Sequence, residues 1–212
     1  GKNVLLTRFD TLLTAIDQAG LPQNPEPDSW KKVEILNLDG MRIRQLDAKE
    51  GEVLDLWTSP SGKWLATVHA GGTLVLWTSE GKRFNTFKPP VLSGRAGMPG
   101  TRENEILHID FHPNDSLMAI CFRQDAACLY PISGKSAAPV MLWHEHLVTF
   151  ARFSEDGRRV LTGSADNTAA VWDLKGNQLY HLLGHKNDVT GGKFIDQGEQ
   201  VLTTSLDGTV RR

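Results

Sequence analysis

Apolar and polar residues alternate along most of this chain, and short turns interrupt the alternation at regular intervals. Four stretches show the pattern most clearly: VLDLWTSPSGKWLATV, ILHIDFHPNDSLMAIC, VTFARFSEDGRRVLTG and VTGGKFIDQGEQVLTT. A period of two is typical of β-strands, and the central SPSG, HPND, SEDG and DQG are typical of tight turns. No segment has helical periodicity of comparable strength, so the pattern predicts an all-β chain built from hairpins.

A second recurring pattern accompanies the hairpins. The segments VEILNLDG, TLVLWTSEG, ACLYPISG and AAVWDLKG share an apolar run, one large residue and a short turn with glycine. Their large residues are Leu36, Trp77, Tyr130 and Trp172, which stand 41, 53 and 42 residues apart. Four short strands in each repeat of this length are typical of a β-propeller blade, because so small a sheet buries its faces only against its neighbours.

These repeats resemble the WD-repeat β-propeller family, and their even spacing is similar to that of bacterial WD-repeat arrays. The strongest unit spans residues 144–185, with a glycine-histidine pair at Gly184 and His185 and a tryptophan-aspartate pair at Trp172 and Asp173. The resemblance implies blades of four antiparallel strands, named a to d outward from the axis. About four to five blades are represented, and because rings of this family close with about seven, we expect the chain to be part of a larger ring.

The repeats predict a single propeller segment over residues 1–212. Strands of blade 4 are expected at 148–153, 159–164, 168–173 and 178–183. The predicted boundaries are 1–46 for a partial blade 1, 47–90 for blade 2, 88–104 for an insertion loop, 105–142 for blade 3, 143–184 for blade 4 and 185–212 for a partial blade 5.

The stretch GSADNTAAVWD places a serine and an aspartate two positions apart between two histidines, the residue types that activate a serine nucleophile. The resemblance instead implies a structural hydrogen-bond network inside each blade. Its members are His144, Ser164, Asp166 and Trp172 in blade 4, and His185, Ser205 and Asp207 in blade 5. Since the set recurs at the repeat spacing and catalysis needs it once, we expect no catalytic residues.

The same alignment predicts that blades 2 and 3 lack this network. The aligned positions hold Lys49, His69 and Gly71 in one, and Arg102, Phe122 and Gln124 in the other. No histidine pair has the carboxylate or cysteine partners of a metal site, so we expect neither metal nor cofactor. Cys121 and Cys128 fall on neighbouring strands of blade 3, where two small buried thiols are expected.

Turn lengths indicate where a partner would bind. The a–b and c–d turns are all minimal, whereas the insertions at 18–31 and 88–104 both fall in connections that emerge on the opposite side. Long loops on a rigid scaffold commonly carry binding, so we expect a protein or peptide partner on that face. Candidate contacts are Trp30, Arg95, Arg102, Glu105, Arg123, Leu147, Thr149, Asp188 and Leu206.

Composition narrows the functional classes further. A net charge of -2, with 23% charged residues, does not favour nucleic-acid binding, and no long apolar run predicts a membrane span. Two cysteines favour a reducing compartment, so we expect a cytoplasmic protein.

Together these features predict a non-enzymatic protein-interaction scaffold or sensor module, part of a larger multidomain signalling protein. Two alternatives stay open at this point. One is a propeller enzyme with a central-channel site, for which strand a offers Asp55 and His108, and the other is a purely structural repeat segment.

Overall fold

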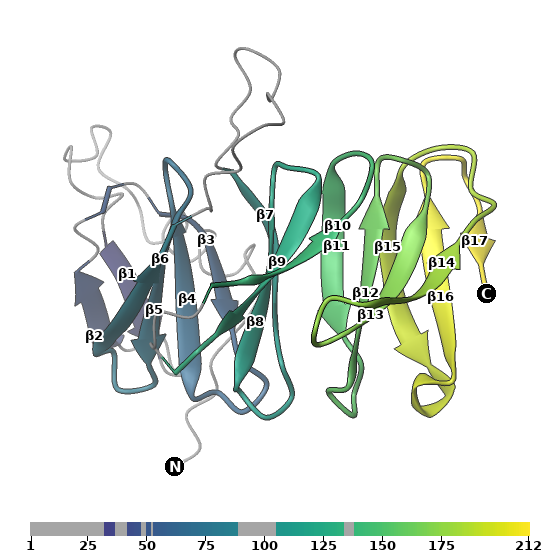
Figure 1. Cartoon of the computed structure of the whole chain (residues 1–212). Coiled ribbons are helices and arrows are strands. Elements are labelled where there is room, and N and C mark those ends of the chain that lie inside the picture. The colour runs from purple at the N-terminus through teal and green to yellow at the C-terminus, as the bar shows by residue number, and fades with distance from the viewer. Residues whose placement is uncertain (1–31, 37–41, 48–49, 52, 89–104, 134–137) are drawn as a thin grey trace. The chain divides into compact units, whose positions relative to one another are not determined.

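A computed structural model describes residues 32–36, 42–47, 50–51, 53–88, 105–133 and 138–212 (Figure 1). Every strand in these ranges pairs with its neighbours in antiparallel fashion, and the helical turn η2, Asp196–Gly198, is the one helical element among them. The all-β class is therefore confirmed. Contacts divide the chain into two compact units, the first containing β1 to β6 and the second β7 to β17, and each is described by itself.

The first unit contains part of blade 1 and the whole of blade 2. Among the described residues, blade 1 contributes a pair of strands, and blade 2 is a four-stranded sheet in the order β3-β4-β5-β6. The strands are β1 Lys32–Leu36, β2 Arg42–Asp47, β3 Val53–Thr58, β4 Trp64–His69, β5 Thr73–Thr78 and β6 Arg83–Phe87.

The second unit contains blades 3, 4 and 5. Blades 3 and 4 are four-stranded sheets, and blade 5 has three strands. Their strands are β7 Ile106–Phe111, β8 Leu117–Phe122, β9 Ala126–Pro131, β10 Val140–Trp143, β11 Val148–Phe153, β12 Arg159–Ser164, β13 Ala169–Asp173, β14 Gln178–Leu182, β15 Val189–Ile195, β16 Gln200–Ser205 and β17 Val210–Arg211. The strands predicted for blade 4 agree with the observed ones to within one residue.

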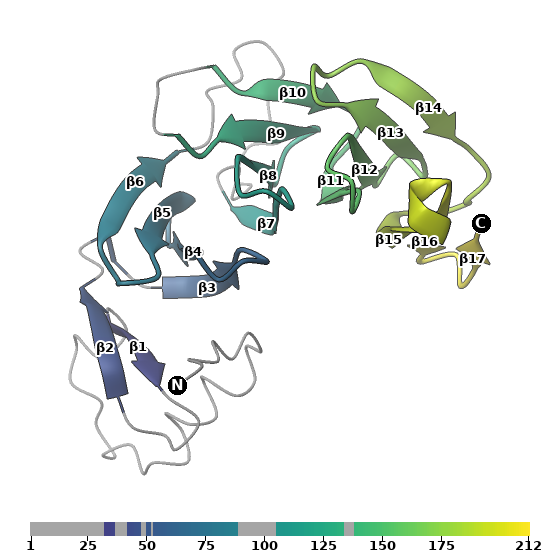
Figure 2. The ribbon, with the colours of Figure 1, turned by 90° about the horizontal axis from the view of Figure 1, so that it is seen from below.

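The three sheets of the second unit stand side by side, as Figure 2 shows, with the first strands β7, β11 and β15 on the inner side and β10 and β14 on the outer side. Apolar side chains fill the spaces between the sheets. Leu142 and Leu129 of blade 3 pack with Val160 and Trp172 of blade 4 in one buried cluster. A second cluster joins blade 4 to Val189 of blade 5. Apolar side chains on both faces of blade 4 are thus buried against the neighbouring blades.

Strand registers make positions in different blades equivalent. Trp77 lies opposite Leu65, and Trp172 lies opposite Val160. Tyr130 holds the same place opposite Met118. The large residues recognised in the repeat pattern therefore occupy one structural position in three blades.

Antiparallel pairing sends alternate turns to opposite ends of the strands. The ends that carry the b–c turns and the d–a connections form what we name the b–c face, and the a–b and c–d turns form the a–b face. In the second unit the b–c face comprises residues 105, 123–125, 145–147, 165–167, 186–188 and 206–208. The insertion at 18–31 lies outside the described residues, as does all of the second insertion after Lys88.

Candidate functional site

A chain of four side chains crosses the interior of blade 4. The indole Nε1 of Trp172 donates to Thr162 Oγ1 at 2.7 Å, and Thr162 Oγ1 lies 2.8 Å from Nε2 of His144. The other ring nitrogen of His144, Nδ1, lies 3.0 Å from Oδ2 of Asp166. The network joins strand c, strand b, the d–a connection and the b–c turn, so it fixes four parts of one blade to each other.

Electrostatics favours a neutral imidazole in this network. Burial lowers the pKa of His144, although the charge and hydrogen bond of Asp166 oppose the shift. Burial would raise the pKa of Asp166, but hydrogen bonds from the hydroxyl and amide of Thr168, the nearby His144 and the amide of Glu145 hold it below its usual value. His144 therefore donates from Nδ1 to a carboxylate, and its Nε2 accepts the hydroxyl proton of Thr162.

The hydroxyl at the centre of the network belongs to Thr162, a residue that the set of network residues predicted from sequence did not include, whereas the predicted Ser164 lies at its edge. Ser164 Oγ donates to the carbonyl of His146 and accepts from the amide of Asp166. Its side chain is fully buried and ties the d–a connection to the b–c turn. Ser164 makes no hydrogen bond to a histidine ring, so the arrangement is not that of an activated serine nucleophile.

Blade 5 repeats this geometry. His185 lies 3.0 Å from Asp207 through Nδ1 and 2.9 Å from Thr203 Oγ1 through Nε2. Ser205 Oγ donates to the carbonyl of Asn187, as Ser164 does to that of His146. Thr203 thus holds the central place in blade 5, and the predicted Ser205 lies at the edge of the network, where it accepts from the amide of Asp207.

Blade 2 was expected to lack the network, but it contains a shorter version. Trp77 Nε1 donates to Thr67 Oγ1 at 2.9 Å, and Thr67 Oγ1 lies 2.9 Å from Nε2 of His69. Nδ1 of His69 lies 3.2 Å from the carbonyl oxygen of Gly51. His69 holds the strand position of Ser164, so one imidazole makes both the contact to the central threonine and the contact to the d–a connection.

Blade 3 differs from the other three at the centre of the blade. Ile120 occupies the place of Thr162, and Phe122 that of Ser164, and both are buried. An apolar residue cannot accept a hydrogen bond from an indole, and Tyr130 replaces the tryptophan. The expectation that blade 3 has no such network is consistent with these residues.

The b–c face presents one pair of residues from each blade of the second unit. In every pair, the residue after strand b donates its amide to the carbonyl of the residue before strand a, at 2.7 to 2.9 Å. The pairs are Arg123 with Glu105, Ala165 with Leu147, and Leu206 with Asp188. This backbone bond fixes the pairs on one face while leaving their side chains to vary.

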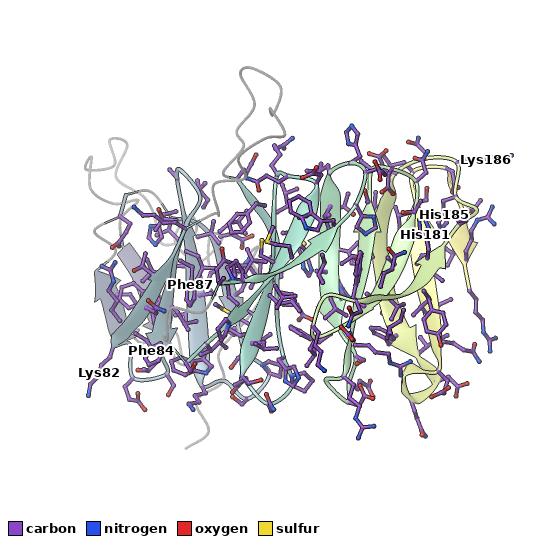
Figure 3. All side chains as sticks on the ribbon, in the orientation of Figure 1. Lys82, Phe84, Phe87, His181, His185 and Lys186 are labelled. Atoms are coloured by element: carbon purple, nitrogen blue, oxygen red, sulfur yellow. The ribbon has the colours of Figure 1, made fainter. Side chains whose placement is uncertain are left out.

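The side chains of the three pairs differ in chemistry. Arg123 Nε donates to Glu105 Oε2 at 2.9 Å, so blade 3 presents a compensated ion pair. Blade 4 presents the apolar Leu147. Blade 5 presents Asp188 and a Leu206 side chain that is 64% exposed. Lys186, in the d–a connection between blades 4 and 5, lies at the upper rim of the second unit, above His185 (Figure 3).

Thr149, another predicted contact of this face, has a structural role. Its hydroxyl lies 3.0 Å from the carbonyl oxygen of Gly163 and 2.5 Å from that of Val189 in the next blade. It links the first strands of blades 4 and 5. Trp30, Arg95 and Arg102 lie outside the described residues, so their part in the face stays a prediction.

The remaining chemistry is limited. No group of three or more histidine, cysteine, aspartate or glutamate side chains able to hold a metal occurs within the part of the chain that the structure describes. Cys121 and Cys128 are both free and buried. Over the described ranges, no helix has the length and apolar character needed to cross a bilayer.

The repeats of this chain are similar to those of a known family and of two known proteins. The family model "WD domain, G-beta repeat" matches residues 40–78, 138–173 and 176–211, together just over half of the chain. The chain is similar to "Guanine nucleotide-binding protein subunit beta" of Schizosaccharomyces pombe, with 28% identity over 152 residues that cover 70% of this chain and 44% of that protein. It is also similar to "Transducin beta-like protein 2" of Homo sapiens, with 24% identity over 126 residues that cover 57% of this chain and 26% of that protein. The matched part spans less than half the length of either relative.

Proposed function

Because this chain belongs to the WD40 family of WD domain, G-beta repeats, we propose that it is a non-catalytic module that binds a protein partner through its b–c face. The observation that carries this proposal is the repeated residue pair. Each blade of the second unit uses one backbone hydrogen bond to hold two side chains on the same face, and the side chains change from blade to blade. A rigid frame with variable side chains is what a specific protein-binding surface requires.

The chemistry of the pairs indicates the kind of contact expected. The Arg123–Glu105 ion pair offers hydrogen-bonding groups at the rim, and the exposed Leu206 offers an apolar anchor. Buried apolar centres with polar rims are typical of protein interfaces. Trp30, Arg95 and Arg102 would extend the same surface on the two insertions.

The cellular location of the module and the larger protein that contains it are also proposals. We place the module in the cytoplasm as a scaffold or sensor within a larger multidomain signalling protein, without cofactor, nucleic acid or membrane. The greater length of both relatives supports a larger whole, and the name of one describes a subunit, which supports action within an assembly. Free thiols at Cys121 and Cys128 suit a reducing compartment.

An enzyme with a site on the inner strands has less support. Burial raises the pKa of Asp55, whose carboxylate accepts the amide of Leu56. Burial also lowers the pKa of His108 to about 4, so this imidazole is neutral at physiological pH. Both groups occupy the equivalent position of strand a in their own blades, but neither is an exposed acid or base.

Capture with matched variants tests the proposal. Proteins captured from the source cells by the wild-type chain are compared with those captured by Arg123→Glu and by Leu206→Asp. The control is Arg158→Glu, an exposed substitution on the a–b face. We expect a partner that is retained by wild type and by the control and lost with both face variants. A partner retained equally by all four proteins, or lost only with the control, contradicts the proposal.

A further inference from the structure

The outer strand of blade 4 lies at the edge of its sheet and exposes large apolar side chains. Among the described strands, β14 pairs with β13 alone, and Figure 2 shows it on the outer side of the second unit. Four of its five residues are exposed, among them Leu179 at 45% and Tyr180 at 60%. Leu183, directly after the strand, is 72% exposed. An open strand edge of this kind is a site for pairing with another strand.

The outer strands of blades 2 and 3 carry features that disfavour such pairing. β6 includes Arg83, which forms an ion pair with Glu50, and the exposed Lys88 follows the strand. β10 has only four residues and is preceded by Pro139, which has no amide proton to donate. Charged side chains, proline and short length are the usual protection of a sheet edge. By contrast, residues 178–184 include no proline and no lysine, arginine or acidic residue.

The residues of this edge have the same polarity pattern in both directions. Leu179-Tyr180-His181-Leu182-Leu183 places two apolar residues on each side of a central histidine. In an antiparallel pair of identical strands centred on His181, Tyr180 of each copy lies opposite Leu182 of the other. Leu179 stands at a bulge in the pairing with β13, so the pairs within 180–182 define the register. Aromatic and aliphatic side chains in direct cross-strand contact stabilise a sheet, so the edge is complementary to itself.

The edge has no charge that would repel a second copy. It also offers no ion pair to an acidic or basic segment, so its complementarity lies in backbone hydrogen bonds and apolar contacts. A row of alternating amide and carbonyl groups is satisfied by another extended strand. One pair of short strands is smaller than the roughly 1,200 Å² that stable interfaces bury, so we expect a weak association that depends on concentration.

We propose that this chain forms a two-fold symmetric dimer, in which β14 pairs in antiparallel fashion with β14 of a second copy. The two four-stranded sheets of blade 4 then join into one sheet of eight strands across the axis. The contact uses the edge of the sheet, whereas the b–c face lies at the ends of the strands. The dimer therefore does not rest on the proposed function, and it leaves both b–c faces accessible. Two such faces on one particle increase the avidity for a partner that carries two binding segments.

Disulfide trapping in the whole chain tests the register of this pair. When His181 is at the centre, the Cβ atoms of the two residues 181 lie about 5 Å apart, within reach of a disulfide, whereas the two residues 178 lie about 20 Å apart. His181→Cys should therefore form a covalent dimer under mild oxidation. Gln178→Cys, the matched control at another exposed position of β14, should remain a monomer. Cys121 and Cys128 are buried, so they should not contribute to this reaction.

Sedimentation equilibrium measures the dimer without a cross-link. For the wild-type chain we expect a monomer–dimer equilibrium as the concentration rises to about 0.5 mM. Tyr180→Lys should raise the dissociation constant at least about fivefold, because both copies lose the contact with Leu182. His181→Lys should also raise it, because it places two like charges opposite each other, and this variant decides if circular dichroism shows that Tyr180→Lys does not fold. Leu206→Asp, on the b–c face, should dimerise like wild type.

Three results would overturn the dimer. The first is a wild-type chain that stays monomeric over this range. The second is dimerisation of Tyr180→Lys and His181→Lys at wild-type strength, or its loss in Leu206→Asp, which would place the contact elsewhere. The third is a disulfide in Gln178→Cys that forms as fast as that in His181→Cys. The capture experiment on the b–c face does not depend on any of these results, so failure of the dimer and failure of the proposed function are distinguishable.

Discussion

The Nε2 atom of His69 lies 2.9 Å from the hydroxyl of Thr67, two residues earlier on the same strand. In blade 4 the equivalent contact joins His144 to Thr162 across 18 residues and comes from the d–a connection. The two blades thus place an imidazole against the same threonine from different parts of the chain. They differ in charge, because His144 has a carboxylate partner, whereas His69 meets a backbone carbonyl.

The burial of His69 predicts a pH dependence for the first unit. Burial lowers the pKa of His69; the carbonyl of Gly51 and the charge of Glu50 oppose this, and Arg83 adds to it. Because the folded pKa lies below that of the unfolded chain, about 6.5, the unfolded chain binds the proton first as the pH falls. The contribution of His69 to the free energy of unfolding is therefore fully present above about pH 6.5 and is lost as the pH falls below it.

Urea unfolding at about pH 7 and pH 5.5, monitored for the first unit, measures this effect. The free energy of unfolding should fall less on acidification in His69→Asn than in wild type. His146→Asn, at an exposed histidine, should behave like wild type. An acid response unaffected by His69→Asn would contradict the role given to this imidazole.

Thr162 and Ser164 should differ in their effect on Trp172. Thr162→Val keeps the side-chain shape but removes the acceptor of the indole and the donor to His144, at a cost of about 1 to 3 kcal/mol. The indole proton resonance of Trp172, assigned with Trp172→Phe, should shift in Thr162→Val and stay in place in Ser164→Ala. The reverse result would show that Ser164, and not Thr162, accepts the hydrogen bond of the indole.

Removal of the Asp166 carboxylate should destabilise blade 4. The carboxylate accepts hydrogen bonds from His144, from the amide of Glu145 and from Thr168. Asp166→Ala leaves the buried imidazole without its acceptor, so we expect a loss of about 1 to 3 kcal/mol and a melting temperature lower by several degrees. Glu155→Ala, an exposed acid in the a–b turn, serves as the control. Equal melting temperatures for the two variants would show that the carboxylate contributes nothing.

The two thiols should be inert in the folded protein. Burial raises the pKa of Cys121 well above its usual value and that of Cys128 to about 12. Thiolates are the reactive species, so neither residue should react with a thiol-specific disulfide reagent at about pH 8 until urea unfolds the chain. Rapid labelling of the native protein would contradict the buried placement.

Much of the fold was predictable because its signals are local and repeat. Alternation gave the strands of blade 4 to within a residue, and the spacing of Trp77, Tyr130 and Trp172 matched one position in three sheets. A turn, a strand and a repeat length are properties of adjacent residues. They therefore do not depend on contacts with distant parts of the chain.

The hydrogen-bond partners were harder to predict, because residues two positions apart on a strand lie on the same face, so the pattern alone does not distinguish Thr162 from Ser164. Threonine stands at the same place in WLATVH, RVLTGS and QVLTTS, and this recurrence was the signal for the central hydroxyl. The alignment placed His69 at the serine position, so blade 2 was predicted to lack the network. The ring of His69 reaches back to Thr67, a contact that an alignment of residue types does not predict.

Hydrogen-deuterium exchange of the chain with its captured partner tests the central claim most directly. Binding at the b–c face predicts slower exchange at 145–147, 165–167, 186–188 and 206–208 of the second unit, and unchanged exchange at the a–b turn 155–158 and the c–d turn 175–177. Slower exchange confined to those a–b and c–d turns, or no change anywhere in blades 4 and 5, would contradict the assignment of this face.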